Sequence, residues 1–473
     1  MRETTLNAEG KGVFFMEYRE IKNLLASGNL CVSVYGLGGV GLAITAVWLR
    51  AGARVIGVDI NDSKVDHLNE GIVDHPEIVV KETIQKAVRE GRFKATTDGV
   101  NASKNSDIKI VIVPLLLTKS KEPDFTAIDS AVTSIARGLK RGDMVIIETS
   151  LPPGTTMYRI KPLLESIGGL KAEEDFGLAY SPERVMVGHA VRDIEEAYPK
   201  IVGGVGPRSS EVAKALYERI AKRGVIVVSN PTVAEFEKLA EGIYRDVNIA
   251  LANELARLAQ KLGVDYEEVK IAANSQPYCH LHDTGSGVGG YCIPVYPYLM
   301  LYSAVSNGIP LELTITARRI NEEQPEYVVK LILDVIKELK LNYNDVKIAI
   351  LGLAFRGDIG DSRVTPVHDI LRGLAKSGIK NIVVHDPFVK NDIVVGELGL
   401  KLTSDLSEAV KDADIVAILT KHSLYRKLTA EYLRDLSGKD RICVVDAVHA
   451  LNPKFTPKGS LYVGVGRPLV KVE

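Results

Sequence analysis

A strand, a glycine turn, a helix and a second strand near the start of the chain constrain the fold most. The run CVSVY (residues 31–35) is short and β-branched, which predicts a buried strand. VGLAITAVWLRAG (40–52) predicts a helix ending at Gly52, and ARVIGVDI (53–60) predicts the next strand. Two strands joined through a helix in this way are the unit of a doubly wound parallel sheet.

The turn between the first strand and the helix fits the pattern G-x-G-x-x-G. Its residues are Gly36, Leu37, Gly38, Gly39, Val40 and Gly41. The first glycine permits a tight turn, the second lets the backbone approach a pyrophosphate, and the third lets helix and strand pack closely. Asp59 ends the next strand near the spacing of an acid that binds ribose hydroxyls, which favours NAD over NADP. A glycine turn without a ligand is the alternative.

Changes in the pattern along the chain predict three parts after an N-terminal segment. Residues 1–29 read as a polar extension followed by a short amphipathic helix, and strand–helix alternation covers residues 30–230. Residues 231–325 are dominated by one long helix, and alternation resumes over residues 326–473. We therefore expect an α/β protein with two Rossmann-like doubly wound domains joined by a central helical domain. The second α/β domain lacks the third glycine, so we expect it to take a different ligand.

Composition and charge exclude several classes of function. The chain has 473 residues, is 46% hydrophobic and 25% charged, and has a net charge of −1, so no global field suggests nucleic acid or an anionic membrane. It has no apolar run long enough for a transmembrane helix and no apolar core of a signal peptide. Its four cysteines are far apart, which indicates a reducing, cytoplasmic compartment rather than a disulfide framework.

Cys292 stands in the glycine-rich stretch GSGVGGYCIPVYPYL, residues 285–299. An isolated cysteine usually packs as a small apolar residue. Glycines supply no side chains to pack against, so the stretch also suits a loop in which a substrate approaches a reactive sulfur. A thiolate can attack an aldehyde and pass it through a thiohemiacetal to a thioester.

Two further interpretations of charged and metal-ligating residues stay open at this point. The stretch YCHLHD offers Cys279, His280, His282 and Asp283 as zinc ligands, although their spacing fits no standard pairing. We expect no metal. Lys238 lies among glutamates on the long helix, which by itself indicates a solvated helix face with i,i+3 or i,i+4 pairing.

The motifs, in their order, resemble the UDP-glucose/GDP-mannose dehydrogenase family of nucleotide-sugar 6-dehydrogenases from about residue 30 to the C-terminus. They are GLGGVGL, ETSLPPGTT, SPERVMVG, KIVGG, AEFEKLAEGIYRDVNIALANE, GVGGYCIPV and LGLAFRGDIGDSRVTP. The residues of the SPERVMVG and GVGGYCIPV motifs are most similar to those of the branch that acts on UDP-N-acetylmannosamine or UDP-N-acetylglucosamine. The resemblance implies oxidation of the sugar's C6 alcohol to a carboxylate with two NAD⁺, for polysaccharide biosynthesis.

The resemblance also assigns roles to residues. Cys292 matches the nucleophile, Lys238 the active-site lysine, and Glu183 the base that activates the hydrolytic water, while Ser150 stands where the family has a threonine near the nicotinamide. It implies that cofactor contacts are made by Gly36, Gly38, Gly39, Val40, Gly41, Asp59, Lys64, Leu115 and Ser150. It implies that substrate contacts are made by Arg184, Val185, Lys238, Gly242, Arg245, Tyr278, Gly289, Phe355, Arg356 and Arg363.

Several positions depart from the family's pattern. Leu115 and Leu116 replace residues of a VPTP motif, which removes a hydroxyl contact to the cofactor. Gly242 stands where an asparagine helps hold the oxyanion, and loss of one such donor can cost roughly 10²–10³ in rate. Tyr278 replaces an arginine that reaches the partner subunit's substrate, and Tyr296 replaces an aspartate four positions after the cysteine.

The resemblance implies a UDP-sugar substrate and a homodimer or higher homo-oligomer formed through the central helix, with neither nucleic acid nor membrane as a partner. Three other outcomes remain open. The enzyme could act on UDP-glucose, it could stop at the aldehyde, or the chain could be a catalytically weak nucleotide-sugar-binding protein of the same fold.

Overall fold

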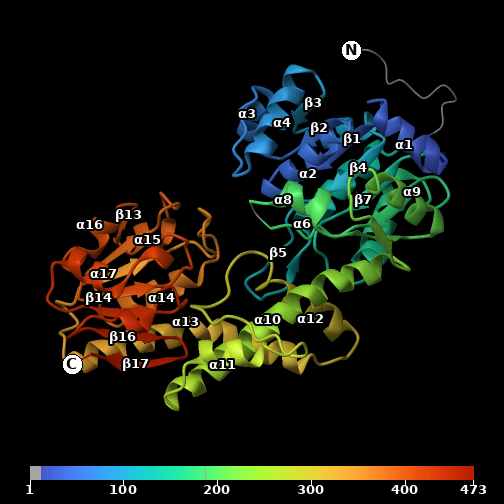
Figure 1. Ribbon diagram of the computed structural model, residues 1–473. Helices are drawn as coiled ribbons and strands as arrows, with labels where there is room; N and C mark the ends of the chain where they lie inside the picture. The colour runs from blue at the N-terminus through green and yellow to red at the C-terminus, as the bar shows by residue number, and fades with distance from the viewer. Residues whose placement is uncertain (1–11, 187, 473) are drawn as a thin grey trace. The chain divides into compact units, whose positions relative to one another are not determined.

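The computed structural model describes residues 12–186 and 188–472. These residues form two compact units, each built around its own sheet (Figure 1). The first unit contains the chain up to Glu241 together with Tyr298–Pro310. The second contains Gly242–Pro297 and the chain from Leu311 onward. The long helix α10 (Pro231–Lys261) contributes residues to both units.

An eight-stranded sheet forms the centre of the first unit, in the order β10-β9-β8-β7-β4-β1-β2-β3. The strands are β1 (Cys31–Tyr35), β2 (Arg54–Val58), β3 (Phe93–Thr96), β4 (Ile108–Val111), β7 (Met144–Ile147), β8 (Gly177–Tyr180), β9 (Lys200–Gly204) and β10 (Val225–Val227). Neighbours pair in parallel except β8 and β9, which are antiparallel. From β1 the chain first adds β2 and β3 on one side and then crosses to add β4 on the other, so the strand order reverses between β1 and β4. Doubly wound sheets bind ligands at such a reversal.

Helices cover both faces of this sheet (Figure 1). α2, α4 and α8 pack together, and α5, α6 and α7 form a second group. The elements of the first unit outside the sheet are η1 (Val13–Phe15), α1 (Tyr18–Ala26), α2 (Gly39–Arg50), α3 (Asp62–Asn69), α4 (Ile78–Arg89), α5 (Gly99–Lys104), β5 (Leu116–Leu117), β6 (Pro123–Asp124), α6 (Thr126–Gly138), η2 (Thr156–Ile160), α7 (Lys161–Gly168), α8 (Ala190–Arg192), η3 (Asp193–Ala197), α9 (Pro207–Tyr217) and α12 (Tyr296–Ser306), the last shared with the second unit.

The N-terminal segment corrects one expectation. The short amphipathic helix is present as α1, but the residues directly before it are not a polar extension. Val13, Phe14 and Met16 are at most 4% exposed and belong to the core of the first unit. Phe14 is held there by its amide, which donates to the carbonyl of Gly142 over 2.8 Å. Residues 1–11 lie outside the described residues.

A seven-stranded sheet forms the centre of the second unit, in the order β13-β12-β11-β14-β15-β16-β17. The strands are β11 (Ile348–Leu351), β12 (Ile382–His385), β13 (Lys401–Thr403), β14 (Ile415–Ile418), β15 (Cys443–Asp446), β16 (Leu461–Gly464) and β17 (Arg467–Lys471). Only β16 and β17 pair antiparallel within it. The predicted pair of doubly wound sheets is thus confirmed.

The second unit's helices include α11 (Tyr266–Ala273), α13 (Glu312–Glu338), α14 (Pro366–Lys376), α15 (Ile393–Glu397), α16 (Leu406–Val410) and α17 (Ala430–Ser437), with the short η4 (Tyr425–Lys427) and η5 (Pro453–Phe455). Ala252 and Ala256 of α10 join the apolar core around its sheet. α13 continues through Pro325, where the sequence placed a domain boundary. The predicted boundaries stay predictions.

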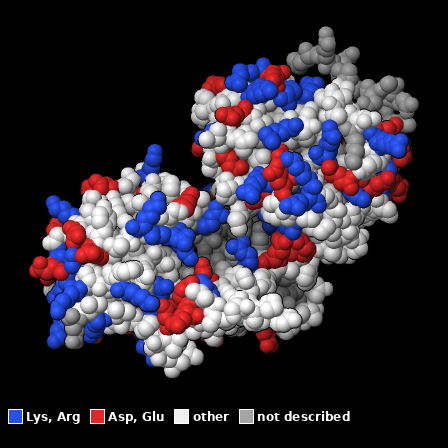
Figure 2. Space-filling model, viewed as in Figure 1, with Lys and Arg blue, Asp and Glu red and all other residues white. Residues whose placement is uncertain are grey.

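The surface carries both signs of charge. Figure 2 shows Lys and Arg interspersed with Asp and Glu over the visible face of each unit. In the part of the chain that the structure describes, no helix combines the length and the apolar character needed to cross a bilayer.

The burial of η1 gives a matched pair of substitutions. Phe14→Ala removes a 2% exposed ring and should cost about 3–5 kcal/mol in the free energy of unfolding. Phe15→Ala removes a neighbouring ring that is 36% exposed and should cost under about 1 kcal/mol. Urea unfolding followed by circular dichroism measures both. Equal small losses would mean that the segment is the polar extension that the sequence indicated.

Candidate functional site

The loop after β1 has the geometry of a pyrophosphate-binding turn. Gly36 has a φ of 99°, in the left-handed region that favours glycine. A Cβ on Gly41 would lie 1.8 Å from the carbonyl oxygen of Gly36, so turn and helix touch because residue 41 has no side chain. Gly38 and Gly39 have no atom within 4 Å of the Cβ position. Their backbone at the start of α2 is therefore open to a phosphate, which fits a dinucleotide.

Asp59 ties the end of β2 to the same loop. Its Oδ2 accepts hydrogen bonds from the amide of Leu37 and from Nζ of Lys64, each over 3.0 Å. Its Oδ1 accepts from the amide of Asn61 over 3.1 Å. A carboxylate offers about four acceptor positions, so one stays open to a ribose hydroxyl. The structure thus brings Asp59 and Lys64 together beside the glycine turn.

The other predicted cofactor positions lie at neighbouring strand ends. Leu115 follows β4 and is buried, while Ser150 follows β7 and is half-buried. Oγ1 of Thr149 donates to the carbonyl of Val113 over 2.8 Å, which joins these two strand ends. Val40 is half-buried in the first turn of α2. All these positions lie at the edge of the sheet where its parallel strands end.

Glu183 lies just beyond the end of β8 and is 9% exposed. Its Oε1 accepts a hydrogen bond from the amide of Arg184 over 2.9 Å, and its Oε2 accepts one from Nζ of Lys200 over 2.5 Å. Lys200 opens β9, which runs antiparallel to β8, so it begins at the edge where β8 ends. Both oxygens of the predicted base are thus held by donors.

Arg184 and Val185, the predicted sugar-nucleotide contacts, follow at once. Nη1 of Arg184 lies 2.9 Å from Glu241 and 3.5 Å from Glu237, both on α10. Burial, with the negative charge of Glu241, raises the pKa of Glu237 to about 7. Val185 is half-buried. The arginine is therefore anchored by two carboxylates, and a ligand phosphate would have to compete with them.

Lys238 corrects the expectation of a solvated helix face, because it is only 8% exposed. One turn earlier, the buried Glu235 accepts hydrogen bonds from the amides of Gly154 and Thr156, over 2.6 and 2.8 Å. Burial raises the pKa of Glu235 to about 7, against the effect of these donors. Glu235 joins α10 to the loop that follows Ser150, and the helix thereby presents Lys238 to the protein interior.

Cys292 is the accessible thiol of the chain. All four cysteines are described and free, and Cys292 is exposed whereas Cys443 is buried and Cys31 and Cys279 are half-buried. Burial raises the pKa of Cys31 to about 11 and that of Cys443 further still. Nucleophilic attack needs an accessible thiolate, so exposure favours Cys292 and disfavours its interpretation as an apolar filler.

The glycines before Cys292 pack against the loop after β11. A Cβ on Gly289 would lie 2.6 Å from the carbonyl oxygen of Val364 and 2.8 Å from Cβ of Phe355. A Cβ on Gly290 would lie 2.9 Å from the ring of Phe355, and the Gly290 amide donates to the Val364 carbonyl over 3.1 Å. At these two positions the absent side chains make room for a protein loop, whereas the sequence had suggested room for a substrate.

Two departures from the expected pattern form a single contact. Gly242 of α10 is buried, and Tyr296, which begins α12, is 7% exposed. A Cβ on Gly242 would lie 2.2 Å from Cδ2 of Tyr296, so the ring fills the place of any side chain at residue 242. The amide of Tyr296 donates to the carbonyl of Cys292 over 3.0 Å. The tyrosine therefore packs the turn that carries Cys292 onto α10.

The predicted nucleotide contacts of the second unit lie in the loop after β11. Phe355 and Arg356 are half-buried and Arg363 is exposed. Arg363 pairs with Asp361 over 2.7 Å, and its guanidinium lies 5.3 Å from the ring centre of Tyr291. The loop thus places Arg363 close to Tyr291, the residue before the nucleophile, which suits an anionic ligand.

The last two predicted substrate residues point outward within this chain. Arg245 is exposed on α10, and Tyr278, after α11, is 96% exposed. A side chain so exposed makes little contact with its own chain. Any contact that involves most of this side chain is therefore with a ligand or another molecule.

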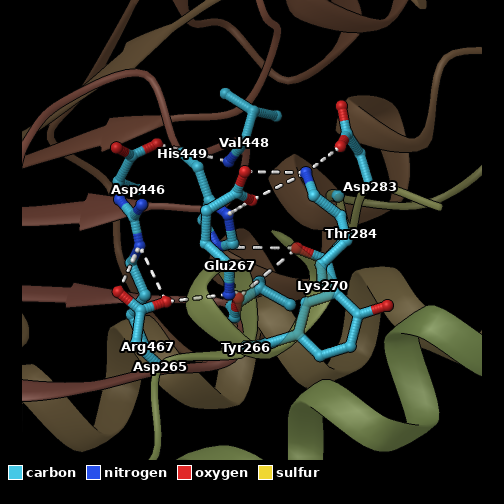
Figure 3. Close-up of polar contacts among 12 residues, drawn as sticks. Asp265, Tyr266, Glu267, Lys270, Asp283, Thr284, Asp446, Val448, His449 and Arg467 are labelled. Atoms are coloured by element: carbon cyan, nitrogen blue, oxygen red, sulfur yellow. Dashed lines mark hydrogen bonds and ion pairs between the residues drawn. The ribbon is translucent and has the colours of Figure 1, made fainter. Parts of the chain in front are cut away.

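A polar network joins α11 and the segment before Cys292 to the second sheet (Figure 3). Glu267 accepts a hydrogen bond from Nζ of Lys270 and lies 3.2 Å from Nδ1 of His449, which follows β15. The imidazole and the ammonium group lower the pKa of Glu267 to about 2, although burial opposes them. Asp283 lies 2.5 Å from Lys270 and 2.8 Å from Lys421.

This network bears on the zinc alternative. Asp283 is committed to two lysines, and the rings of His280 and His282 pack edge to face with centroids 5.4 Å apart. Over residues 12–186 and 188–472, no three His, Cys, Asp or Glu side chains converge as metal ligands would. The stretch around Cys279 serves here as a structural link.

Comparison with known proteins decides the family. Profiles of the UDP-glucose/GDP-mannose dehydrogenase family match three consecutive segments: the NAD binding domain over residues 30–221, the central domain over 232–323 and the UDP binding domain over 349–453. This chain belongs to the UDP-glucose/GDP-mannose dehydrogenase family. It is therefore an NAD-dependent nucleotide-sugar dehydrogenase, as the motifs implied.

Its relatives cover nearly the whole chain. It is 33% identical over 437 residues to the UDP-N-acetyl-D-mannosamine dehydrogenase of Pyrococcus horikoshii. That match covers 92% of this chain and 99% of the relative. It is 35% identical over 410 residues to an NDP-N-acetyl-D-galactosaminuronic acid dehydrogenase of Ralstonia solanacearum, covering 85% and 93%. The solved structure of UDP-D-ManNAc dehydrogenase from P. horikoshii gives a TM-score of 0.84 at 31% identity, covering 93% and 99%.

In this dehydrogenase the structure adds residues that the motifs did not single out. Lys200 pairs with both Glu183 and Glu148, and the hydroxyl of Tyr217 donates a hydrogen bond to Glu148. A signal existed, because Glu148 directly follows the apolar strand MVII, and Lys200 opens the apolar KIVGG. A charge that begins or ends a buried strand needs a partner, and the sequence could not say which one.

The contact between Gly242 and Tyr296 makes a double-mutant prediction. Gly242→Ala should destabilise the protein by about 1–3 kcal/mol, because the methyl group overlaps the ring. In a Tyr296→Ala background the same change should stabilise by up to about 1 kcal/mol, since alanine is the better helix former. Chemical unfolding measures both. Gly396→Ala on α15, where the Cβ position is open, is the control, and equal costs in the two backgrounds would contradict the contact.

Proposed function

We propose that this dehydrogenase oxidises the C6 hydroxyl of a UDP-N-acetylhexosamine to a carboxylate, for polysaccharide biosynthesis. UDP-N-acetylmannosamine and UDP-N-acetylglucosamine are the first candidates, because the SPERVMVG and GVGGYCIPV motifs resemble that branch and the relatives are named for N-acetylated sugars. The observation that carries the chemistry is the exposed thiol of Cys292 among three less accessible cysteines.

The proposed reaction removes four electrons in two stages. At each stage C6 loses a hydride, for which NAD⁺ would be the acceptor when bound, and the oxygen on C6 loses its proton to solvent. After the first stage the sulfur of Cys292 adds to the aldehyde carbon, and the aldehyde oxygen takes a proton to give a thiohemiacetal. After the second stage the carbon–sulfur bond remains in a thioester. Water then adds to that carbon, the carbon–sulfur bond breaks, and the products are the carboxylate and the free cysteine.

Three further residues have assigned roles. Lys238 stabilises negative charge on the C6 oxygen or moves its proton, and its burial strengthens such an interaction. Glu183 takes the proton of the hydrolytic water. Ser150, at the end of β7, orients a water near the nicotinamide. The buried setting of Glu183 and Lys238 supports these roles, since catalytic charges work best where water is excluded.

We assign nucleotide-sugar contacts on the same basis. Phe355, Arg356 and Arg363 bind the uridine diphosphate, because arginines suit phosphates and the loop lies beside the nucleophile's loop. Arg184, Val185 and Arg245 contact the sugar nucleotide, and Gly289 lets the nucleophile's loop lie close to the β11 loop. Gly242 offers no donor to an oxyanion.

A second function fits the same fold. The tyrosine at residue 296 and the glycine at residue 242 remove an aspartate and an asparagine that the family uses, so a catalytically weak nucleotide-sugar-binding protein would carry these changes as well. Action on UDP-glucose is the other alternative. Product analysis distinguishes all three.

The first test is the stoichiometry of NADH. We expect two NADH and one uronate per UDP-N-acetylhexosamine consumed, measured by absorbance and mass spectrometry on a panel of UDP-sugars. Cys292→Ser should abolish uronate formation, with a loss of at least about 10³ in rate, because the thioester cannot form.

Cys279→Ser is the matched control, because it removes a half-buried thiol from the same region and should retain activity. One NADH and a released aldehyde would contradict the four-electron reaction. Binding of UDP-sugars without any NADH would favour the second function.

We further propose a homodimer formed through α10, and a cytoplasmic location for an enzyme whose four cysteines are all free thiols. Leu251, Leu255 and Leu258 recur along α10 at helical spacing, Leu262 follows directly after its end, and all four are 36–69% exposed. A stripe of large apolar side chains along one helix face is typical of a surface covered by another subunit. Tyr278, also exposed, would reach the second copy.

The dimer has a direct test. Leu258→Glu places a charge in the stripe and should convert the dimer to a monomer at micromolar concentration, measured by light scattering after size exclusion. Ile393→Glu changes another exposed apolar residue, on α15, and should leave the mass unchanged. A wild type that is itself monomeric would contradict the proposal.

A further inference from the structure

A buried charge cluster lies behind Glu183 in the first unit. Glu148 follows β7, Glu183 follows β8 and Lys200 begins β9. β7 and β8 are parallel and β9 is antiparallel to β8, so two strand ends and one strand start meet at one edge of the sheet. Topology therefore brings three ionisable side chains from distant parts of the chain together.

The contacts within the cluster are specific. Nζ of Lys200 lies 2.5 Å from Oε2 of Glu183 and 3.5 Å from Oε1 of Glu148. The hydroxyl of Tyr217, on α9, donates to the same Oε1 of Glu148. Oε2 of Glu148 accepts no hydrogen bond from the described residues. The side chains of Lys200 and Glu148 are 6% and 1% exposed.

Two cavities adjoin the cluster, and on the Glu183 side the described residues include two more charged groups, Arg184 and Asp193. A small cavity beside the cluster is lined by Glu148, Glu183, Lys200, Tyr217 and the apolar Ile44, Val47, Trp48, Ile194 and Ile220. The ammonium group of Lys200 also lies 5.1 Å from the ring centre of Tyr217. Around Glu148 the lining is apolar apart from Glu183, Lys200 and Tyr217, so Lys200 is the cation that faces Glu148, and Glu148 is the carboxyl group with an unused oxygen.

This arrangement makes Glu148 the group that gains and loses a proton near neutral pH. Burial raises the pKa of Glu148 to about 7, the attraction of Lys200 opposes the rise, and the charge of Glu183 adds to it. Burial alone would lower the pKa of Lys200, but the two carboxylates outweigh it and raise the pKa above its usual value. Glu148 is therefore protonated below about pH 7 and ionised above it, while Lys200 stays charged throughout.

We propose that Glu148 is a positioning residue that acts through Lys200 to set the basicity of Glu183, and this rests on the proposed role of Glu183 as the hydrolytic base. When Glu148 is protonated, the charge of Lys200 is committed to its ion pair with Glu183. When Glu148 is ionised, Lys200 is shared between two carboxylates and Glu183 accepts the proton of the water more readily. That water adds to the thioester carbon as the bond to Cys292 breaks.

The test is the pH dependence of thioester hydrolysis. Single turnovers are quenched, and the decay of the Cys292 adduct is followed by intact mass. The wild-type rate should rise about three- to tenfold through a midpoint near pH 7. Glu148→Gln should lose this rise and stay at the low-pH rate, with KM for the UDP-sugar unchanged. If the hydrolysis rate of Glu148→Gln still rose with the wild-type midpoint but was lower at every pH, Glu148 would only support the fold.

Two variants guard against a folding artefact. Tyr217→Phe keeps both charges and removes one donor to Glu148, so the midpoint should move to higher pH. Asp143→Asn breaks a different buried ion pair of the first unit, with Lys109, and should leave the midpoint in place. A midpoint that moves equally in Asp143→Asn would overturn the proposal.

A measurement without substrate separates this proposal from the function on which it rests. Infrared pH-difference spectra of the free protein should show a buried carboxyl band that disappears above about pH 7, is absent in Glu148→Gln and shifts its midpoint in Glu183→Gln. If no adduct forms on Cys292, the proposed function fails while this coupling still stands. If the band is unchanged by Glu183→Gln, the coupling fails whatever the enzyme's product.

Discussion

The direction of the strands decides where the chemistry of the first unit can lie. β1, β2, β4, β7 and β8 run parallel and are mostly apolar, so most polar groups lie where the strands end, and the buried Lys109 within β4 is paired with Asp143. The glycine turn, Asp59, Ser150 and Glu183 follow four of these strands and therefore share one edge. Lys200 reaches that edge from the opposite direction, because β9 is antiparallel. One reversed strand thus adds a cation to a row of strand ends that otherwise offers acids and hydroxyls.

The first unit also buries several carboxyl groups, and burial raises their pKa. Glu148, Glu235 and Glu237 each have a pKa raised to about 7, and burial is the largest cause in all three. Their partners differ: an ammonium group for the first, backbone amides for the second and the guanidinium of Arg184 for the third. Clusters of shifted carboxyl groups are typical of functional sites, because a fold selected only for stability would replace them.

The sequence predicted what local patterns can determine. The glycine spacing, the apolar runs and the uninterrupted helix correctly predicted both sheets and α10, and the ordered motifs predicted the family. It could not predict the burial of Lys238, nor the pairing of Arg184 with Glu237 and Glu241, which lie 53 and 57 positions away. The apolar residues of η1 were read as part of a polar tail for the same reason. The roles of Cys292 and Glu183 stay predictions, supported by exposure in one case and by a buried ion pair in the other.

The packing of Tyr296 on Gly242 restricts the order in which such an enzyme can evolve. A lineage with a larger residue at position 242 has no room for the ring, so the glycine must be acquired before the tyrosine can be accommodated. Once the tyrosine is in place, a larger side chain at position 242 alone is opposed by the same overlap. Substitutions at the two positions are therefore coupled: a larger side chain at 242 costs least where the ring at 296 has already been lost.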